Sequence, residues 1–96
     1  MRKSNAQPIG DIIKEMLHNL NLEEKVTEAR IAGVWEKVMG EGIARYTSSI
    51  AYRNKSLSIK LSSPVLRQEL SYEKSKIIGL INEALGQNSV EEITFN

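Results

Sequence analysis

Residues 46–62 read YTSSIAYRNKSLSIKLS, and this stretch decides the fold because it carries the chain's clearest β-hairpin signal. Residues 46–53 are rich in strand-forming side chains. Residues 57–62 alternate apolar and polar side chains, which is typical of a half-buried strand. Between the two runs, Asn54-Lys55 predicts a two-residue turn, since Asn tolerates positive φ.

Helical periodicity surrounds this hairpin on both sides. Pro8 and Pro64 are placed to open helices, Asn21 to separate the first two helices, and Gly40 and Gly86 to end helices. The predicted elements in chain order are helices 8–20 and 22–39, strands 46–53 and 57–62, a long helix 64–85 and a closing strand 90–95.

These elements predict an α+β fold with the order helix-helix-strand-strand-helix-strand and a small three-stranded sheet. A sheet with one apolar face needs cover, so the helices are expected on that face in a compact two-layer domain. The other face stays free. If the closing strand pairs parallel to the second strand, the two form a right-handed strand–helix–strand unit. Residues 1–7 are expected to be a mobile N-terminal tail, and residues 8–96 a single domain.

Composition excludes several classes of site. The 96 residues contain no cysteine and one histidine, His18, so neither a disulfide framework nor a thiolate or His-cluster metal site is expected. No apolar run approaches the roughly 20 residues of a membrane span, and no secretory signal is evident, so a cytoplasmic protein without membrane contact is expected. The serines lack a nucleophile elbow and no Gly-rich phosphate loop follows a strand, so no enzyme and no cofactor are predicted.

Positive charge is concentrated in the middle of the chain. Residues 37–67 hold six cationic side chains and one anionic one, a net +5, whereas residues 1–36 sum to −1 and residues 68–96 to −3. Cations gathered on one small sheet are an electrostatic footprint for polyanions. The alternative is an ordinary solvated surface or the protection of an edge strand by lysine. The candidate nucleic-acid-binding residues are Lys37, Arg45, Arg53, Lys55, Lys60 and Arg67.

Other side chains have competing interpretations. Tyr46 and Tyr52 could stack on bases, but their spacing with Ile50 favours packing at the core or its rim. Trp35 is predicted to be a core anchor. The helix at 8–20 is predicted to pack on the chain's own core, with cover by a partner as the alternative.

The motifs around the hairpin resemble one protein family. Residues 35–40, WEKVMG, resemble its W-x-x-V-V/M-G signature, residues 43–47, IARYT, its I-A-x-H/Y-T stretch, and residues 57–63, LSIKLSS, its L-x-V-x-V-S-S strand. Further similar pieces are QEL at 68–70, LINEALG at 80–86 and the segment 90–95. In this order, over residues 34–96, the set is similar to the DciA-like family, also catalogued as domain-of-unknown-function family seven-two-one.

This resemblance implies a KH-like fold and a role in bacterial chromosome replication. Family members bind DNA, bind the replicative DnaB-type helicase and assist its loading. Leu66 stands where the family often has Trp, and the extra tail of longer members is absent. The G-x-x-G phosphate clamp of true KH domains is also missing, because Gly40-Glu41-Gly42 has a different spacing.

The sequence therefore predicts a non-enzymatic nucleic-acid-binding adaptor. Its expected partners are single-stranded or forked DNA and the replicative helicase. Two alternatives stay open, because basic patches read phosphates and not sugars. The first is an RNA-binding module, and the second is a protein-interaction domain without nucleic-acid binding. No pattern in the chain fixes a homo-oligomeric state.

Overall fold

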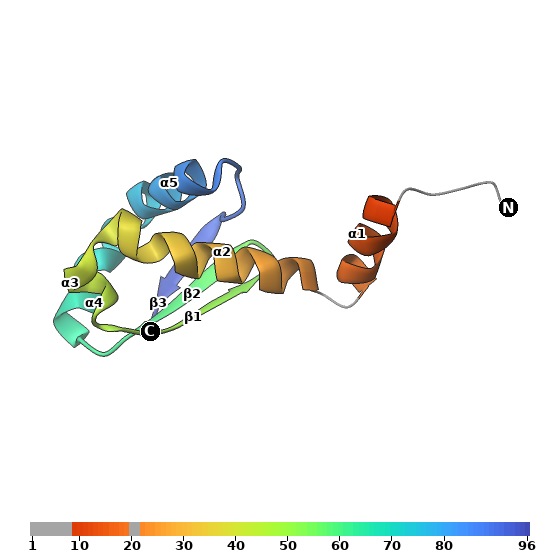
Figure 1. Ribbon diagram of the computed structural model, residues 1–96. Helices are drawn as coiled ribbons and strands as arrows, with labels where there is room; N and C mark the ends of the chain where they lie inside the picture. The colour runs from red at the N-terminus through yellow and green to blue at the C-terminus, as the bar shows by residue number, and fades with distance from the viewer. Residues whose placement is uncertain (1–8, 20–21) are drawn as a thin grey trace, which may run out of the picture.

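The structure, a computed structural model, describes residues 9–19 and 22–96 of the chain, and side chains within that range except those of residues 9 and 16–19. The predicted tail at 1–7, the helix start at Pro8 and the break at Asn21 lie outside the described residues. The elements are α1 Ile9–Asn19, α2 Leu22–Met39, α3 Glu41–Ala44, β1 Thr47–Arg53, β2 Ser56–Leu61, α4 Pro64–Ser71, α5 Lys74–Leu85 and β3 Glu92–Phe95 (Figure 1).

The three strands form one mixed sheet with the order β1-β2-β3. β1 and β2 pair antiparallel, with Ile50 opposite Ile59, whereas β2 and β3 pair parallel, with Leu57 opposite Ile93. The α+β class and the parallel closing strand are therefore confirmed. The arrangement is compatible with a KH-like fold.

The predicted turn closes the hairpin. Arg53 pairs with Ser56, which leaves Asn54 and Lys55 as the two loop residues. Both have positive φ, 51° at Asn54 and 63° at Lys55. Two consecutive left-handed residues match the twist of the flanking strands, as in a type I′ turn.

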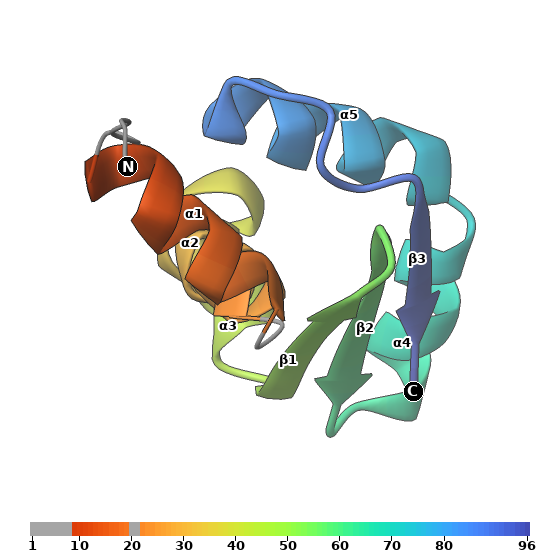
Figure 2. The same ribbon diagram turned by 90° about the vertical axis from the view of Figure 1, so that its right-hand side faces the viewer.

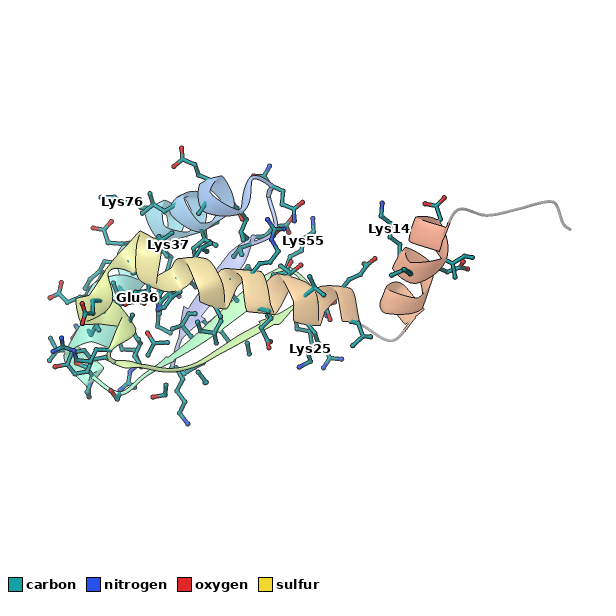
Figure 3. All side chains as sticks on the ribbon, viewed as in Figure 1. Lys14, Lys25, Glu36, Lys37, Lys55 and Lys76 are labelled. Atoms are coloured by element: carbon teal, nitrogen blue, oxygen red, sulfur yellow. The ribbon has the colours of Figure 1, made fainter. Side chains whose placement is uncertain are left out.

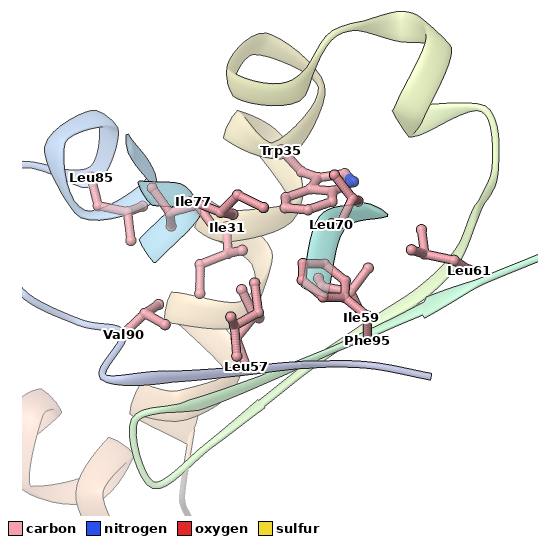
Figure 4. Packing of buried hydrophobic residues seen from close by; sticks show 12 residues of the cluster. Ile31, Trp35, Leu57, Ile59, Leu61, Leu70, Ile77, Leu85, Val90 and Phe95 are labelled. Carbon is pink, nitrogen blue, oxygen red and sulfur yellow. The ribbon is translucent and has the colours of Figure 1, made fainter. Parts of the chain in front are cut away.

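The core lies between the sheet and helices α2, α4 and α5 (Figures 2 and 4). Trp35 is 2% exposed, which confirms its predicted core position. Its Nε1 donates to Thr47 Oγ1 at 2.8 Å, and that hydroxyl donates to the Ile43 carbonyl at 3.1 Å. The ring thus ties α2 to the first residue of β1. The buried hydrophobic residues are Ile31, Trp35, Leu57, Ile59, Leu61, Leu70, Ile77, Ile81, Leu85, Val90, Ile93 and Phe95.

The opposite face of the sheet is open, as predicted. Ser49, Ala51, Lys60 and Thr94 are exposed and alternate with positions that are half-buried in β1 and buried in β2 and β3. Most side chains on this face are small and polar, so it is a hydrophilic surface from which the longer side chain of Lys60 projects.

The single helix predicted over 64–85 is wrong, because the chain forms two helices there. The Tyr72 N–H donates to the Glu69 carbonyl at 3.3 Å and the Glu73 N–H to the Leu70 carbonyl at 3.0 Å, which tightens the last turn of α4 and ends it. The break lets α4 pack on β2 and β3 while α5 packs on α2. A short helix, α3, was also not predicted, and the closing strand begins at Glu92 instead of Val90.

Helix α1 lies at one end of the molecule and contacts α2 (Figure 1). Ile12 and Ile13 are 42% and 50% exposed, so core packing is wrong for these two residues. The side chains of Met16, Leu17 and Leu20, which share the predicted apolar stripe, lie outside the described side chains.

Candidate nucleic-acid interface

The structure distributes the six predicted cations over three places. Arg53 and Lys55 lie at the turn of the β1–β2 hairpin, which we call the hairpin tip. Arg45, Lys60 and Arg67 lie around the other end of the same two strands, which we call the hairpin base. Lys37 is separate on α2, well away from Lys55 along the molecule (Figure 3). Five of the six are exposed, and Arg67 is half-buried.

Carboxylates from distant parts of the chain surround the hairpin tip. Glu24 Oε2 accepts from the Asn54 N–H at 2.6 Å, and Glu28 Oε2 accepts from the Tyr52 N–H at 2.9 Å. Glu91 pairs with Lys55 at 3.5 Å between Nζ and Oε2. Three carboxylates thus lie at the tip, one paired with Lys55 and two bound to backbone N–H groups. The local charge at the tip is not the strongly positive one that the sequence suggested.

The same carboxylates affect Tyr52, which lies on the core face of β1. Its hydroxyl donates to the Ser89 carbonyl at 2.5 Å, so the ring links β1 to the loop before β3. Burial raises the pKa of Tyr52 above its ordinary value, and the negative charges of Glu24 and Glu91 raise it further. Packing, favoured over base stacking for this residue, is confirmed.

The hairpin base lacks such compensation. Arg67 Nη1 lies 3.5 Å from the Leu61 carbonyl oxygen, which holds the guanidinium at the end of β2. Lys60 immediately precedes Leu61 in β2 and projects from the open face of the sheet. It has no ion pair within the described part of the chain. Arg45 has one acidic neighbour, Glu41, at 3.9 Å, and both side chains are well exposed. Such a pair is screened by water and contributes little.

The chain that joins these cations is fixed by hydrogen bonds. The Tyr46 carbonyl accepts from the Ser62 N–H at 2.9 Å and from the Ser62 hydroxyl at 3.3 Å. The Ser63 hydroxyl caps α4 by accepting from the Leu66 N–H at 3.2 Å. Pro64 follows this cap and opens α4, as predicted. The base is therefore an ordered part of the fold.

An apolar groove of about 400 Å³ lies beside the hairpin base. Tyr46, 45% exposed, and Val65, 71% exposed, line it. Leu66 is half-buried and packs against the core. It stands at the position where the family identified by the motif resemblance often has Trp. The complete lining is Met39, Gly42, Ile43, Tyr46, Ser63, Val65, Leu66 and Glu69.

The turn between α4 and α5 does not supply a KH-type phosphate clamp. This junction consists of Tyr72 and Glu73 and holds no glycine. A depression next to it, of about 400 Å³, is lined by Lys74, Ile78 and the segment 91–94, and so contains two carboxylates against one amine. Phosphate groups would meet net negative charge there. Among these surfaces, the hairpin base is the better place for a polyanion.

Two kinds of functional contact were missed from the sequence. Nothing in the local sequence indicates that Glu24 and Glu28 bind backbone N–H groups at the hairpin. Asn82 was noted only within a motif. Its Nδ2 donates to the Val90 carbonyl at 2.9 Å, and its Oδ1 accepts from the N–H groups of Ser89 at 3.1 Å and Val90 at 2.9 Å. Asn82 therefore shapes the loop that carries Glu91 to the tip.

The described residues contain no group of three or more His, Asp or Glu side chains placed to hold a metal ion. The side chain of His18 is outside the described set. In the same part of the chain, every helix is too short or too polar to cross a membrane.

Comparisons with known proteins agree with the motif resemblance. The family model described as "Dna[CI] antecedent, DciA" matches residues 8–95. A UPF0232 protein of Rhodococcus jostii is 28% identical over 89 residues, which cover 93% of this chain and 47% of that protein. UPF0232 proteins of Mycobacterium marinum and Mycobacterium tuberculosis are each 24% identical over 93% of this chain and 48% of their own lengths. The chain spans about half the length of these curated relatives.

Proposed function

From the premise that this chain belongs to the DciA family, we propose that it binds nucleic acid at the hairpin base and contacts the replicative DnaB-type helicase. The family is one of helicase-loading adaptors rather than enzymes, and membership supports a helicase-loader-related role. The finer assignments, to single-stranded or forked DNA and to direct contact with the helicase, are proposals.

The observation that carries the nucleic-acid proposal is the uneven neutralisation of the basic residues. At the hairpin tip, Glu91 pairs with Lys55. Glu24 and Glu28 accept from backbone N–H groups of the tip, which brings two more negative charges to this end of the hairpin. At the base, Lys60 and Arg67 have no acidic partner in the described part of the chain, and Arg45 has only the long, exposed contact with Glu41. Phosphates release counterions most favourably where protein cations are not already paired.

The test is fluorescence anisotropy with single-stranded DNA at low and moderate salt. Neutralising the base with Lys60→Gln and Arg67→Gln should weaken binding by about tenfold or more and lower the log–log salt slope by about 1.4, at roughly 0.7 per lost phosphate contact. Neutralising the tip with Arg53→Gln and Lys55→Gln should change affinity less.

Lys25→Gln with Lys76→Gln is the matched control, because both lysines are exposed and lie outside the hairpin (Figure 3). Equal losses for this control and for the base variant would mean that only net charge matters. Binding that is unchanged when Arg53, Lys55 and Lys60 are all reversed to glutamate, together with no loss in the base variant, would remove the proposed interface.

Helicase contact is tested separately by pull-down of the purified helicase after nuclease treatment. Retention of the helicase without nucleic acid would support direct contact. Loss of retention on nuclease treatment would mean that DNA bridges the two proteins. A matched RNA competing as well as DNA would favour the RNA-binding alternative. Negligible affinity for both, with the helicase retained, would favour a pure protein-interaction domain.

A further inference from the structure

We propose that the apolar groove beside the hairpin base holds one unstacked nucleobase, with Tyr46 as its stacking surface and Glu69 as its polar contact. This inference rests on the proposed function, because it assumes that the phosphate backbone runs past Arg45 and Arg67. It adds a base-binding site and a base preference, neither of which follows from charge alone.

Tyr46 is held in place by its backbone while its ring stays accessible. Its carbonyl accepts from both the N–H and the hydroxyl of Ser62, and its own N–H donates to the Ile43 carbonyl at 3.1 Å. The side chain is nevertheless 45% exposed. An ordered backbone with an accessible aromatic ring suits stacking, since little order remains to be imposed on binding. Tyr52, in contrast, is committed to the core face and to Ser89.

The walls of the groove are apolar and large enough for a base. Met39, Ile43 and Leu66 in its lining are partly buried and pack against the core, and Val65 on the first turn of α4 is 71% exposed. The volume of about 400 Å³ exceeds that of any single nucleobase. A flat heterocycle would cover Val65 and the Tyr46 ring together, and both surfaces otherwise remain in water.

Charge is arranged around the groove in a way that fits a nucleotide better than an apolar peptide side chain. Arg45 immediately precedes Tyr46 and Arg67 immediately follows Leu66, so a cation stands next in the chain to a lining residue on each side. Phosphates that flank a bound base would therefore have cations nearby.

Glu69 is the acidic residue of the lining. A carboxylate accepts hydrogen bonds from the exocyclic amine of cytosine or adenine. Thymine and uracil offer only the ring N3–H, which stands between two carbonyl oxygens that would repel the carboxylate. The groove should therefore prefer amine-bearing bases.

The experiment compares the affinities of oligo(dC), oligo(dA) and oligo(dT) of equal length by anisotropy, at one salt concentration. Wild-type protein should bind oligo(dC) and oligo(dA) at least threefold more tightly than oligo(dT). Tyr46→Leu should weaken all three by about tenfold, the size expected for loss of one stacked base, and Tyr46→Phe should restore binding. Glu69→Gln should abolish the preference for amine-bearing bases.

Two matched controls separate a groove effect from a general one. Tyr72→Leu removes another exposed tyrosine, 74% accessible and outside the groove, and should leave affinity unchanged. Glu83→Gln removes an exposed carboxylate on α5 and should leave base preference unchanged. Thermal melts of each variant verify folding, and Tyr46→Phe with Glu69→Gln still test the site if Tyr46→Leu fails to fold.

Failure of this inference is distinguishable from failure of the proposed function. If the oligomers bind with a salt slope that depends on Lys60 and Arg67, but equally tightly and without sensitivity to Tyr46 or Glu69, the groove does not hold a base. If no oligomer binds, the proposed function itself falls, and the groove proposal with it. Competition by an apolar peptide instead of by mononucleotides would likewise overturn the assignment.

Discussion

The two ends of the β1–β2 hairpin have similar numbers of cations but different electrostatic surroundings. At the tip, carboxylates of α2 and of the loop before β3 contact the backbone or pair with Lys55. At the base, three cations have one long, exposed ion pair among them within the described chain. Charge density along a sequence therefore differs from charge density on a surface, because long-range packing decides which cations are already neutralised.

The largest expected effect concerns the residue that anchors the base. Trp35→Ala should reduce the free energy of unfolding by about 3–5 kcal/mol, because a large buried ring is lost and Thr47 loses its indole donor. For a domain of this length, this is a large part of the expected roughly 5–14 kcal/mol. Urea unfolding followed by circular dichroism measures it.

Trp35→Phe separates the two contributions, since it keeps most of the ring and removes the N–H that Thr47 accepts. Its cost should be smaller, and hydrogen exchange should increase first at the start of β1. A loss below about 1 kcal/mol for Trp35→Ala would contradict the core role.

The second prediction removes the acids of the tip. Glu24→Gln with Glu28→Gln should destabilise the fold by about 1–2 kcal/mol, because two charge-assisted hydrogen bonds to the edge of β1 are weakened. The same double variant should raise affinity for single-stranded DNA by about threefold to tenfold at low salt, because it removes two negative charges from the end of the hairpin that carries Arg53 and Lys55.

Glu73→Gln with Glu83→Gln is the matched control for charge, since both carboxylates are exposed on the α4–α5 side. If this control raises affinity as much as the tip variant does, local masking at the tip is wrong. Chemical denaturation and anisotropy on the same preparations report stability and affinity together.

Much of this fold is predictable from local sequence, and the reasons are visible in particular residues. The bounds of α2 agree with the predicted 22–39, and Gly40, at φ 91°, follows its last residue as predicted. The Asn54-Lys55 turn follows from backbone preference. The break at Tyr72-Glu73 was missed because neither residue is a helix breaker, and the tertiary packing of α4 and α5 imposes it.

The candidate site was predicted less completely. The sequence indicates that most of the basic residues are exposed, because they lie in the turn, on the polar side of an alternating strand or near the end of a helix. It does not indicate their division into tip and base, because Glu24 and Glu28 lie more than 20 residues before the groups they bind and Glu91 lies 36 residues after Lys55. The groove at Tyr46 could not be predicted from the sequence either, because its lining includes residues of α3 and α4, which are separate in the chain.

A smaller effect is expected at the turn itself. Lys55→Gly should stabilise the fold by about 0.5–1 kcal/mol, because a residue without Cβ adopts φ 63° without strain. The variant loses its ion pair with Glu91, but that pair is exposed and weak. Thermal unfolding measures the gain.

The same variant sharpens the comparison of the two ends. Because three carboxylates lie at the tip and no acidic side chain of the described chain pairs with Lys60, Lys55→Gly should weaken DNA binding less than Lys60→Gly does. Lys60 has ordinary extended backbone in β2, so its replacement by glycine should destabilise the sheet. Equal or greater loss of affinity at Lys55 would show that the tip contacts phosphate despite its acids.

The smallest expected effect is a pH dependence at Tyr52. Its pKa is raised in the folded state by burial and then by Glu24 and Glu91, so the neutral hydroxyl is favoured over the phenolate. The stabilisation is therefore fully present below the unfolded tyrosine pKa of about 10 and is lost as pH rises through the folded pKa.

Difference titration of tyrosinate absorbance between wild type and Tyr52→Phe should show one group that ionises above about pH 10. Glu24→Gln should move that ionisation to lower pH, because one repelling charge has gone. Wild-type stability should fall more steeply than that of Tyr52→Phe in alkaline solution, and parallel curves would mean that folding does not raise the pKa of this hydroxyl.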